Sequence, residues 1–363
     1  MMAEYCYVHV PFCRSICGYC DFQRAGYSEI LADKWLDALE IEIQNREISD
    51  HLKTIYLGGG TPSCLKMSQL KRLLQLLEPY SKHVIEYTME MNPESCNDDV
   101  VRLASEFGVN RVSLGVQTFD DELLKMMNRR HTSQMIKEAI HTLNLYGITN
   151  ISVDAMYSLP TQTMEQWLNT LKQCTELPVT HLSMYSLTIE PGSAFARQHL
   201  EALDSETEAD MYEAAIEYLE SQGFEQYEIS SFSKSGFQSL HNKAYWHYED
   251  FIGLGLGASG KENHQRYDHV RGFHHYLDNP LKLELISLTE EDEMFEMLMM
   301  GLRLKEGMSL ELFYKRFHHK FEEVYAVPLK KCLDRKWIVI DQGKIKATNR
   351  GFEILNTVLE EFI

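Results

Sequence analysis

Three cysteines near the start of the chain have a spacing that suits metal chemistry. Cys13, Cys17 and Cys20 follow the pattern C-x3-C-x2-C, and nothing close to them completes a set of four. A closed structural zinc site needs four ligands, whereas three thiolates on a four-iron cluster leave one iron open for another molecule. The pattern therefore favours an iron–sulfur site with an open iron. A zinc site completed by His9 is the weaker alternative, because His9 belongs to the predicted strand before the cysteine loop.

The elements that position these cysteines are short apolar segments alternating with amphipathic ones in residues 1–232. We expect strands at residues 5–10, 54–57, 86–91, 111–115, 151–156 and 181–187. We expect helices at residues 30–46, 67–77, 98–107, 134–146, 164–174 and 206–222. This alternation predicts a parallel α/β fold. Periodicity alone does not separate an open sheet from a full or partial barrel.

Polar and glycine-rich residues follow the other predicted strands, as the cysteines follow the first. Residues 58–62 (Gly-Gly-Gly-Thr-Pro) end the second strand, and Glu90 and Asn92 end the third. Gln117 follows the fourth strand and Asp154 lies near the end of the fifth. Ligands bind at the carboxyl ends of the strands in parallel α/β folds. We therefore expect these residues to share one site with the cysteines.

The rest of the chain divides into two further parts. Residues 233–285 are rich in glycine, histidine and aromatic residues and are predicted to be a less regular connecting region. Residues 286–363 are predicted to form a small C-terminal helical domain. Its helices at 290–304, 310–317 and 322–335, a hairpin at 337–347 and a last helix at 351–362 resemble a winged helix. Because the formal net charge is −19, we expect a packing or lid role and no nucleic-acid partner.

The location of the protein is constrained by what its sequence lacks. No apolar run is long enough to span a bilayer, so we expect no transmembrane segment. The start, Met-Met-Ala-Glu-Tyr-Cys, has neither the basic nor the apolar region of a signal peptide. We therefore expect a cytoplasmic protein whose eight cysteines are reduced thiols or metal ligands.

The segment Tyr-Val-His-Val-Pro-Phe-Cys-x3-Cys-x-Tyr-Cys-Asp-Phe, which begins at Tyr7, resembles the radical S-adenosylmethionine superfamily. The resemblance implies a partial (β/α)6 barrel. It also implies a [4Fe–4S] cluster held by Cys13, Cys17 and Cys20, with S-adenosylmethionine (SAM) on the fourth iron. Electron transfer into the sulfonium of SAM would then yield a 5′-deoxyadenosyl radical.

The same resemblance implies a set of contacts with SAM. The residues concerned are Tyr7, Gly59, Gly60, Thr61, Glu90, Gln117, Arg129, Asp154 and Ser186. In this assignment the glycine-rich turn receives the methionine amino group, and the two carboxylates hold ribose hydroxyls. The guanidinium would bind the methionine carboxylate through two parallel hydrogen bonds.

Four further segments resemble oxygen-independent coproporphyrinogen III dehydrogenase and its relatives. They are Ser-Leu-Gly-Val-Gln-Thr-Phe (113–119), Tyr-Ser-Leu-Pro (157–160), Tyr-Ser-Leu-Thr-Ile-Glu-Pro-Gly (185–192) and Tyr-Glu-Ile-Ser (227–230). That enzyme has a further cysteine where this chain has Phe22, and an extension before the cluster strand, whereas this chain starts six residues before Tyr7. Both differences point away from oxidative decarboxylation of coproporphyrinogen III, which is the alternative function.

The segment His-Asn-Lys-Ala-Tyr-Trp at 241–246 resembles the H-N-x-x-Y-W motif of the HemW family of haem chaperones. This resemblance implies that the protein binds haem and delivers it to haem proteins such as respiratory enzymes. The imidazole of His241 suits axial ligation of haem iron. Alternatively, His241 is hydrogen bonded inside an aromatic cluster that packs against the barrel. The sequence leaves open whether SAM is cleaved, and so whether the protein is an enzyme.

One segment departs from the family pattern. Residues 251–260 resemble a stretch in which the family has a histidine, and this chain has Ser259 instead. The same stretch matches the dinucleotide pattern G-x-G-x-x-G at 255–260. No amphipathic helix follows it, so we reject a nicotinamide site.

The sequence also leaves open a homodimer and peripheral contact with a membrane.

Overall fold

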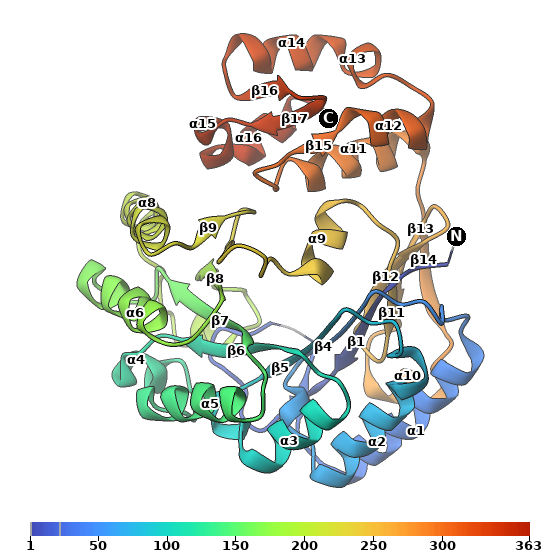
Figure 1. The fold of residues 1–363 in the computed structure, drawn as a ribbon, viewed down its shortest axis with the longest axis vertical. Coiled ribbons are helices and arrows are strands. Elements are labelled where there is room, and N and C mark those ends of the chain that lie inside the picture. Colours follow the sequence, from blue (N-terminus) through green and yellow to red (C-terminus); the bar gives the residue numbers. More distant parts are fainter. Residues whose placement is uncertain (1, 22) are drawn as a thin grey trace.

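The computed structural model describes residues 2–21 and 23–363 (Figure 1). Phe22, which the sequence comparison used to separate the chain from the porphyrinogen enzyme, lies outside the described residues. The distinction based on Phe22 therefore rests on the sequence alone.

A sheet with the strand order β11-β1-β4-β5-β6-β7-β8-β10-β9 forms the centre of the molecule. Its six middle strands are parallel and follow the order of the chain. They are β1 (Tyr5–Val10), β4 (Thr54–Gly59), β5 (Glu86–Met91), β6 (Arg111–Gln117), β7 (Asn150–Tyr157) and β8 (His181–Ser186). This arrangement confirms the predicted α/β fold with a partial barrel of six strand–helix repeats.

Amphipathic helices cover the outer face of this sheet (Figure 1). They are α1 (Glu29–Asn45), α2 (Met67–Leu77), α3 (Asp98–Glu106), α5 (Ser133–Leu145), α6 (Met164–Glu176) and α8 (Ser205–Ser221). In α2 the buried residues Leu70, Leu73, Leu74 and Leu77 recur at helical spacing. They join strand residues in one core, which fixes the strands beneath the helices. The sequence missed the short helices α4 (Asp121–Met126) and α7 (Ala194–Arg197).

Residues 233–285 are more regular than predicted. They contain α9 (Leu240–Trp246), β11 (Ile252–Leu254), β12 (Ser259–Glu262), β13 (Gln265–His269), α10 (Phe273–Asp278) and β14 (Leu283–Ser287). The strand β11 pairs in parallel with β1 and extends the central sheet, whose far edge is formed by β10 (Ser231–Ser233) and β9 (Glu225–Gln226). These strands are too short for alternation to reveal them. The domain boundaries at 232 and 286 stay predictions.

The C-terminal module comprises the elements from α11 (Glu290–Gly301) to the end of the chain and has its own apolar core. It contains β15 (Met308–Ser309), α12 (Leu310–Phe317), α13 (Phe321–Val324), α14 (Ala326–Asp334), β16 (Ile338–Asp341), β17 (Lys344–Ala347), α15 (Asn349–Glu353) and α16 (Leu355–Glu360). The predicted single helix at 322–335 is wrong, because it breaks at Tyr325. Pro328 lacks an N–H and its ring would clash with the carbonyl four residues earlier.

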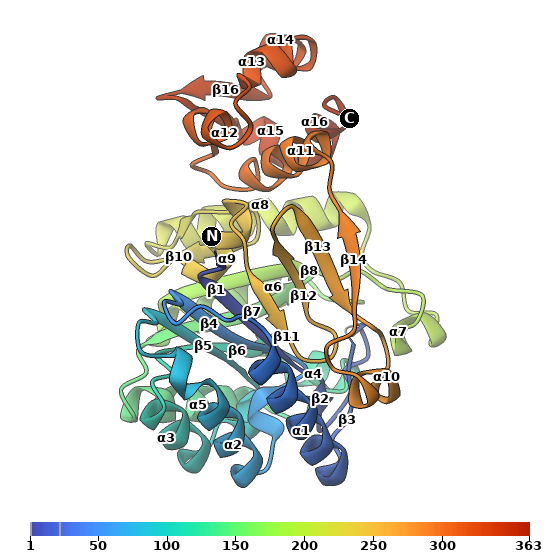
Figure 2. The ribbon, with the colours of Figure 1, turned by 90° about the vertical axis from the view of Figure 1, so that its right-hand side faces the viewer.

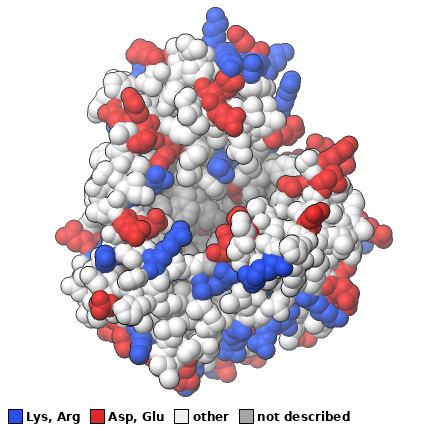
Figure 3. All heavy atoms as spheres, turned by 180° about the vertical axis from the view of Figure 1, so that it is seen from behind, with Lys and Arg blue, Asp and Glu red and all other residues white. Residues whose placement is uncertain are grey.

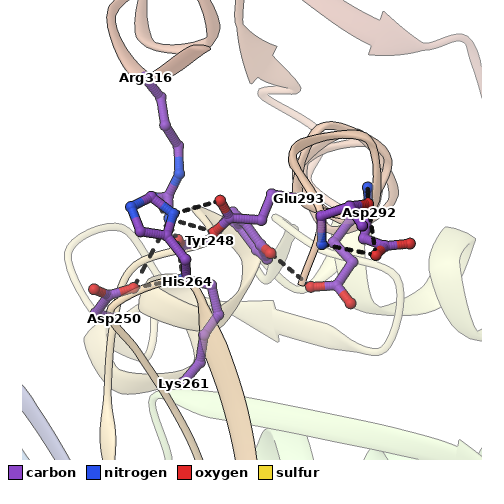
Figure 4. A network of polar contacts seen from close by, with 9 residues as sticks. Tyr248, Asp250, Lys261, His264, Asp292, Glu293 and Arg316 are labelled. Atoms are coloured by element: carbon purple, nitrogen blue, oxygen red, sulfur yellow. Dashed lines mark hydrogen bonds and ion pairs between the residues drawn. The ribbon is translucent and has the colours of Figure 1, made fainter. Parts of the chain in front are cut away.

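A buried polar network ties the C-terminal module to the rest of the chain (Figure 4). Arg316 of α12 donates to Glu293 of α11 at 3.1 Å and lies over the ring of Tyr248. Lys261 of β12 lies over the same ring and bonds to Asp250 at 2.5 Å. Since Lys261 and Glu293 are buried, each charge needs its partner. The network therefore holds α11 and α12 against the strands that follow α9.

The surface carries both signs of charge. Figure 3 shows acidic and basic side chains intermixed on the face seen from behind, which is hollowed near its centre below the C-terminal module. In Figure 2 that module stands above the sheet, with β14 leading up to it. Among the described residues, every helix is too short or too polar to cross a bilayer.

Candidate functional site

A cavity of about 420 Å³ opens at the carboxyl ends of the parallel strands. It collects most of the residues that the sequence assigned to one site. Its wall includes Cys13, Cys17, Cys20, Gly59, Gly60, Thr61, Glu90, Gln117, Arg129, Asp154 and Ser186. The parallel order of the strands accounts for this convergence, because it brings six carboxyl ends to one edge.

The cysteine loop is anchored to two other parts of the wall. Cys13 ends the short strand β2 (Phe12–Cys13), which pairs with β3 (Ala25–Gly26). Gly18 donates its N–H to the carbonyl of Met127 and accepts from the N–H of Phe195, both at 2.9 Å. A Cβ at Gly18 would lie 2.4 Å from the Phe195 ring, so a larger residue there would displace that ring. The loop that carries Cys17 and Cys20 is therefore held on both sides.

The glycine-rich turn after β4 is tightly packed against the strand that leads to the cysteines. Gly59 has φ +106, and a Cβ there would lie 2.6 Å from the ring of His9. A Cβ at Gly60 would lie 2.4 Å from the backbone oxygen of Phe12. Thr61 follows, with its hydroxyl 3.9 Å from the sulfur of Cys13. The glycines thus let the turn approach both the cysteine strand and the cavity.

Two carboxylates line the cavity from β5 and β7, which lie on either side of β6, and both have raised pKa values. Burial raises the pKa of Glu90 to about 7, against hydrogen bonds from the Tyr56 hydroxyl and the Gly59 N–H. Burial raises the pKa of Asp154 to about 6, although Ser113 donates to this carboxylate. Asp154 also raises the pKa of Glu90, and Arg111 lowers both. Two partly buried acceptors with pKa values near neutrality suit a ligand that supplies donors or positive charge.

Arg129 links the cysteine loop to the ends of β5 and β6. Its guanidinium donates to Asn92 Oδ1 at 2.8 Å, to the Gly115 carbonyl at 2.6 Å and to the sulfur of Cys17 at 3.3 Å. Its buried Nε has no hydrogen-bond partner among the described residues. Gln117, at the bulged end of β6, has φ 65. A left-handed backbone at a bulge is typical of a residue re-aimed at a site.

Three residues considered at the sequence level do not line the cavity. Tyr7 donates its hydroxyl to His9 Nδ1 at 3.0 Å, behind the glycine-rich turn. His241 is buried near the amino ends of the strands and bonds to Thr54 and Tyr245. Ser259 is exposed, and its hydroxyl pairs with Asp268 across the β12–β13 hairpin.

Sequence reasoning missed side chains that form or support the wall. Tyr56 holds Glu90, Ser113 holds Asp154, and Tyr185 lines the cavity beside Ser186. Tyr56 was detectable in principle, because residues two apart on a strand face the same side, and Gly58, two positions later, faces Glu90. Tyr185 had no such signal, since the direct neighbour of Ser186 on a strand is expected to face away.

The three thiols line the cavity without converging on one point. Within residues 2–21 and 23–363, no three His, Cys, Asp or Glu side chains are grouped as for a single metal ion. His9, the suggested fourth zinc ligand, donates from Nε2 to the Gln23 carbonyl at 2.9 Å. A closed zinc site needs four ligands around one ion. The thiols of an iron–sulfur cluster bind to several irons and need no common centre.

Comparisons with known protein families match both parts of the chain. A model described as the radical SAM superfamily matches residues 7–174, and a model described as the HemN C-terminal domain matches residues 288–354. The solved structure of coproporphyrinogen III oxidase (HemN) from Escherichia coli superposes with a TM-score of 0.87. It covers 99% of this chain and 90% of that one at 23% identity, which shows the shared fold. The match of the family model to residues 7–174, which carry the cysteine loop and most of the cavity wall, assigns this part of the chain to the radical SAM superfamily.

Relatives that match nearly the whole chain identify its family within this superfamily. The chain is 38% identical to heme chaperone HemW of Lactococcus lactis, over 98% of this chain and 96% of that protein. It is 34% identical to heme chaperone HemW of Bacillus subtilis, over 98% of each. The protein of the same name from Escherichia coli is 33% identical over 98% of this chain and 97% of its own length. The chain belongs to the HemW family.

The close fit of Gly60 yields a test of the cavity wall. We expect Gly60→Ala to lower the free energy of unfolding by roughly 1–3 kcal/mol, because its Cβ would overlap the Phe12 backbone. Gly26→Ala is the matched control, since a Cβ at Gly26 meets nothing within 4 Å. Urea unfolding of both variants measures the difference. Equal stability of the two variants would contradict the close packing of Gly60 against the Phe12 backbone.

Proposed function

We propose that the protein binds haem and delivers it to haem proteins, using a [4Fe–4S] cluster and SAM held in the cavity. The observation that carries the cofactor assignment is the convergence of three thiols, a glycine-rich turn and two carboxylates on one cavity. The haem assignment rests on membership of the HemW family, whose relatives are heme chaperones by name. The acceptors we propose are cytoplasmic or membrane-associated haem proteins, such as respiratory enzymes.

The residues present fit both cofactors. Cys13, Cys17 and Cys20 would hold three irons of the cluster, and the fourth iron would be left for SAM. The close-packed glycines at 59 and 60 leave only backbone to meet the ligand. When bound, the cluster supplies an electron to the sulfonium of SAM.

The wall also offers partners for each polar part of SAM. Arg129 has a buried Nε without a partner among the described residues, which suits the methionine carboxylate. Glu90 and Asp154 are acceptors for ribose hydroxyls, and their negative charge favours the sulfonium. Gln117 and Ser186 add hydrogen-bonding groups to the same wall. Tyr7 would act indirectly, by holding His9 under the turn.

The porphyrinogen oxidation considered as the alternative is less supported. The relatives that match nearly the whole chain at 33–38% identity are heme chaperones. The likeness to coproporphyrinogen III oxidase, at 23% identity, shows the fold. Haem chaperoning is therefore the function we adopt.

Haem titration of the anaerobically reconstituted protein tests this function. We expect saturable binding of one haem per chain with a dissociation constant on the order of micromolar. The bound haem should pass to apomyoglobin, used as a probe acceptor, and the Soret band should move accordingly. Coproporphyrinogen III should remain unchanged under reducing conditions with SAM. Decarboxylation of the porphyrinogen without saturable haem binding would favour the alternative enzyme.

The raised pKa of Glu90 predicts how SAM affinity depends on pH. Ribose hydroxyls bind best to the ionised carboxylate, and the pKa of Glu90 is about 7. Affinity should therefore be highest above pH 7 and fall as the pH drops, by up to about tenfold per pH unit. Calorimetric titration between pH 6 and 8.5 measures this. Glu90→Gln should remove the step near neutrality, and a pH-independent affinity in the unaltered protein would contradict the assignment.

A further inference from the structure

The helix α9 lies between the barrel and the C-terminal module in both ribbon views (Figures 1 and 2). It carries the His-Asn-Lys-Ala-Tyr-Trp segment, residues 241–246. Glu86, the first residue of β5, accepts the N–H groups of Leu240 and His241, each at 2.9 Å. This contact fixes the start of α9 at the amino ends of the strands. The cavity lies at their carboxyl ends, so α9 sits at the opposite end of the barrel.

His241 is fully engaged at this end of the barrel. Its Nδ1 lies 2.6 Å from the Thr54 hydroxyl and its Nε2 lies 2.7 Å from the Tyr245 hydroxyl. Burial lowers its pKa to about 3, so the ring is neutral. A neutral imidazole has one donor and one acceptor nitrogen, and two hydroxyls satisfy both. Iron ligation would require His241 to lose one of these buried bonds.

The ring of His241 supports a side chain that reaches the cavity. It stacks on the ring of Tyr56, with centroids 5.0 Å apart and planes inclined by 29°. The Tyr56 hydroxyl donates to Glu90 Oε1 at 2.8 Å. Glu90 lines the cavity. One continuous chain of contacts therefore runs through the barrel, from His241 to Tyr56 and from Tyr56 to Glu90.

The opposite side of α9 contacts the C-terminal module. Lys243 and His247 lie 3.1 and 3.3 Å from the carboxylate of Glu306, which also bonds to Lys344. Arg303 lies over the ring of Trp246, 5.6 Å from its centre. Lys243 and Trp246 of the motif, together with His247, thus hold the helix against that module. The helix α9 is therefore held on one side by Glu86 of the barrel and on the other side by the C-terminal module.

We propose that His241 is a positioning residue of the SAM site: it holds the Tyr56 ring so that the Tyr56 hydroxyl stays on Glu90. This inference rests on the proposed function, because Glu90 is assigned to SAM there. It replaces haem ligation as the role of His241. The H-N-x-x-Y-W segment then closes the amino end of the barrel and, through His241 and Tyr56, positions the Glu90 carboxylate at the other end.

Two substitutions of the same residue separate positioning from iron ligation. His241→Phe keeps an aromatic ring against Tyr56 but has no nitrogen for iron, whereas His241→Ala removes both. SAM affinity is measured from pH 6 to 8.5 with reconstituted protein, and haem binding is measured on the same samples. His241→Leu fills the space without a ring and replaces His241→Ala should that variant not fold. Tyr56→Phe, which removes only the hydroxyl, is the direct control for the bond to Glu90.

The inference predicts a distinct pattern across these variants. His241→Phe should keep the affinity and pH profile of the unaltered protein. His241→Ala and Tyr56→Phe should weaken SAM binding about tenfold at neutral pH, the effect of losing a hydrogen bond to a charged group. Their midpoints should rise by roughly one pH unit, because Glu90 loses its donor. Haem binding should persist in all variants.

Other results would overturn either the positioning role of His241 or the proposed function. Loss of haem binding in both His241→Phe and His241→Ala, with an unchanged SAM profile, would make His241 an iron ligand and overturn the inference. A SAM profile insensitive to His241→Ala and His241→Leu would overturn it as well. In those cases the proposed SAM site stands. Absence of SAM binding in the unaltered protein would instead overturn the proposed function, and the role of His241 with it.

Discussion

The parallel order of six strands is the constraint on which the site depends. Because β1, β4, β5, β6, β7 and β8 run in chain order, their carboxyl ends share one edge. Groups as distant in sequence as Cys13 and Ser186 therefore meet at one cavity. The outer helices supply the burial that keeps the strands together. No single loop forms the site, because the strands from β4 to β8 all contribute residues to its wall.

Burial then determines what these side chains can do. Inside the barrel, Glu90 and Asp154 keep pKa values near neutrality, since low polarity disfavours their charged forms. Hydrogen bonds from Tyr56, Ser113 and the Gly59 N–H act in the other direction. The balance makes the charge of the cavity sensitive to its ligand. A sulfonium with neighbouring hydroxyls supplies the positive charge and the donors that the two carboxylates lack.

Much of this architecture could be predicted from the sequence. The bounds of β1, β5, α2 and α12 agree with the periodicity, because these elements have one clear apolar face. The cavity residues at strand ends were found since chain direction alone places them at one edge. The strands β9 to β14 were missed, since each is five residues or shorter and its pairing partners are remote in the chain. Tyr325 interrupts a helix that the apolar pattern continues through.

The role of His241 could not be predicted from the sequence. Residue chemistry allowed either iron ligation or a hydrogen-bonded place in an aromatic cluster. The structure shows the hydrogen-bonded arrangement, with Thr54, Tyr56 and Tyr245 around the ring. Those partners come from β4 and from one turn further along α9, and only the tertiary fold brings β4 to the helix. The spacing of residues in a sequence motif does not show whether the nitrogens of a histidine are already hydrogen bonded or are free to bind iron.

The proposed site requires three cysteines to hold a cluster whose remaining iron is open to SAM. Mössbauer spectroscopy of the reconstituted protein, recorded before and after addition of SAM, tests it most directly. We expect about a quarter of the iron signal, one iron of four, to change on addition of SAM while the rest stays constant. A spectrum that SAM leaves unchanged, or one from isolated iron ions rather than a cluster, would contradict it.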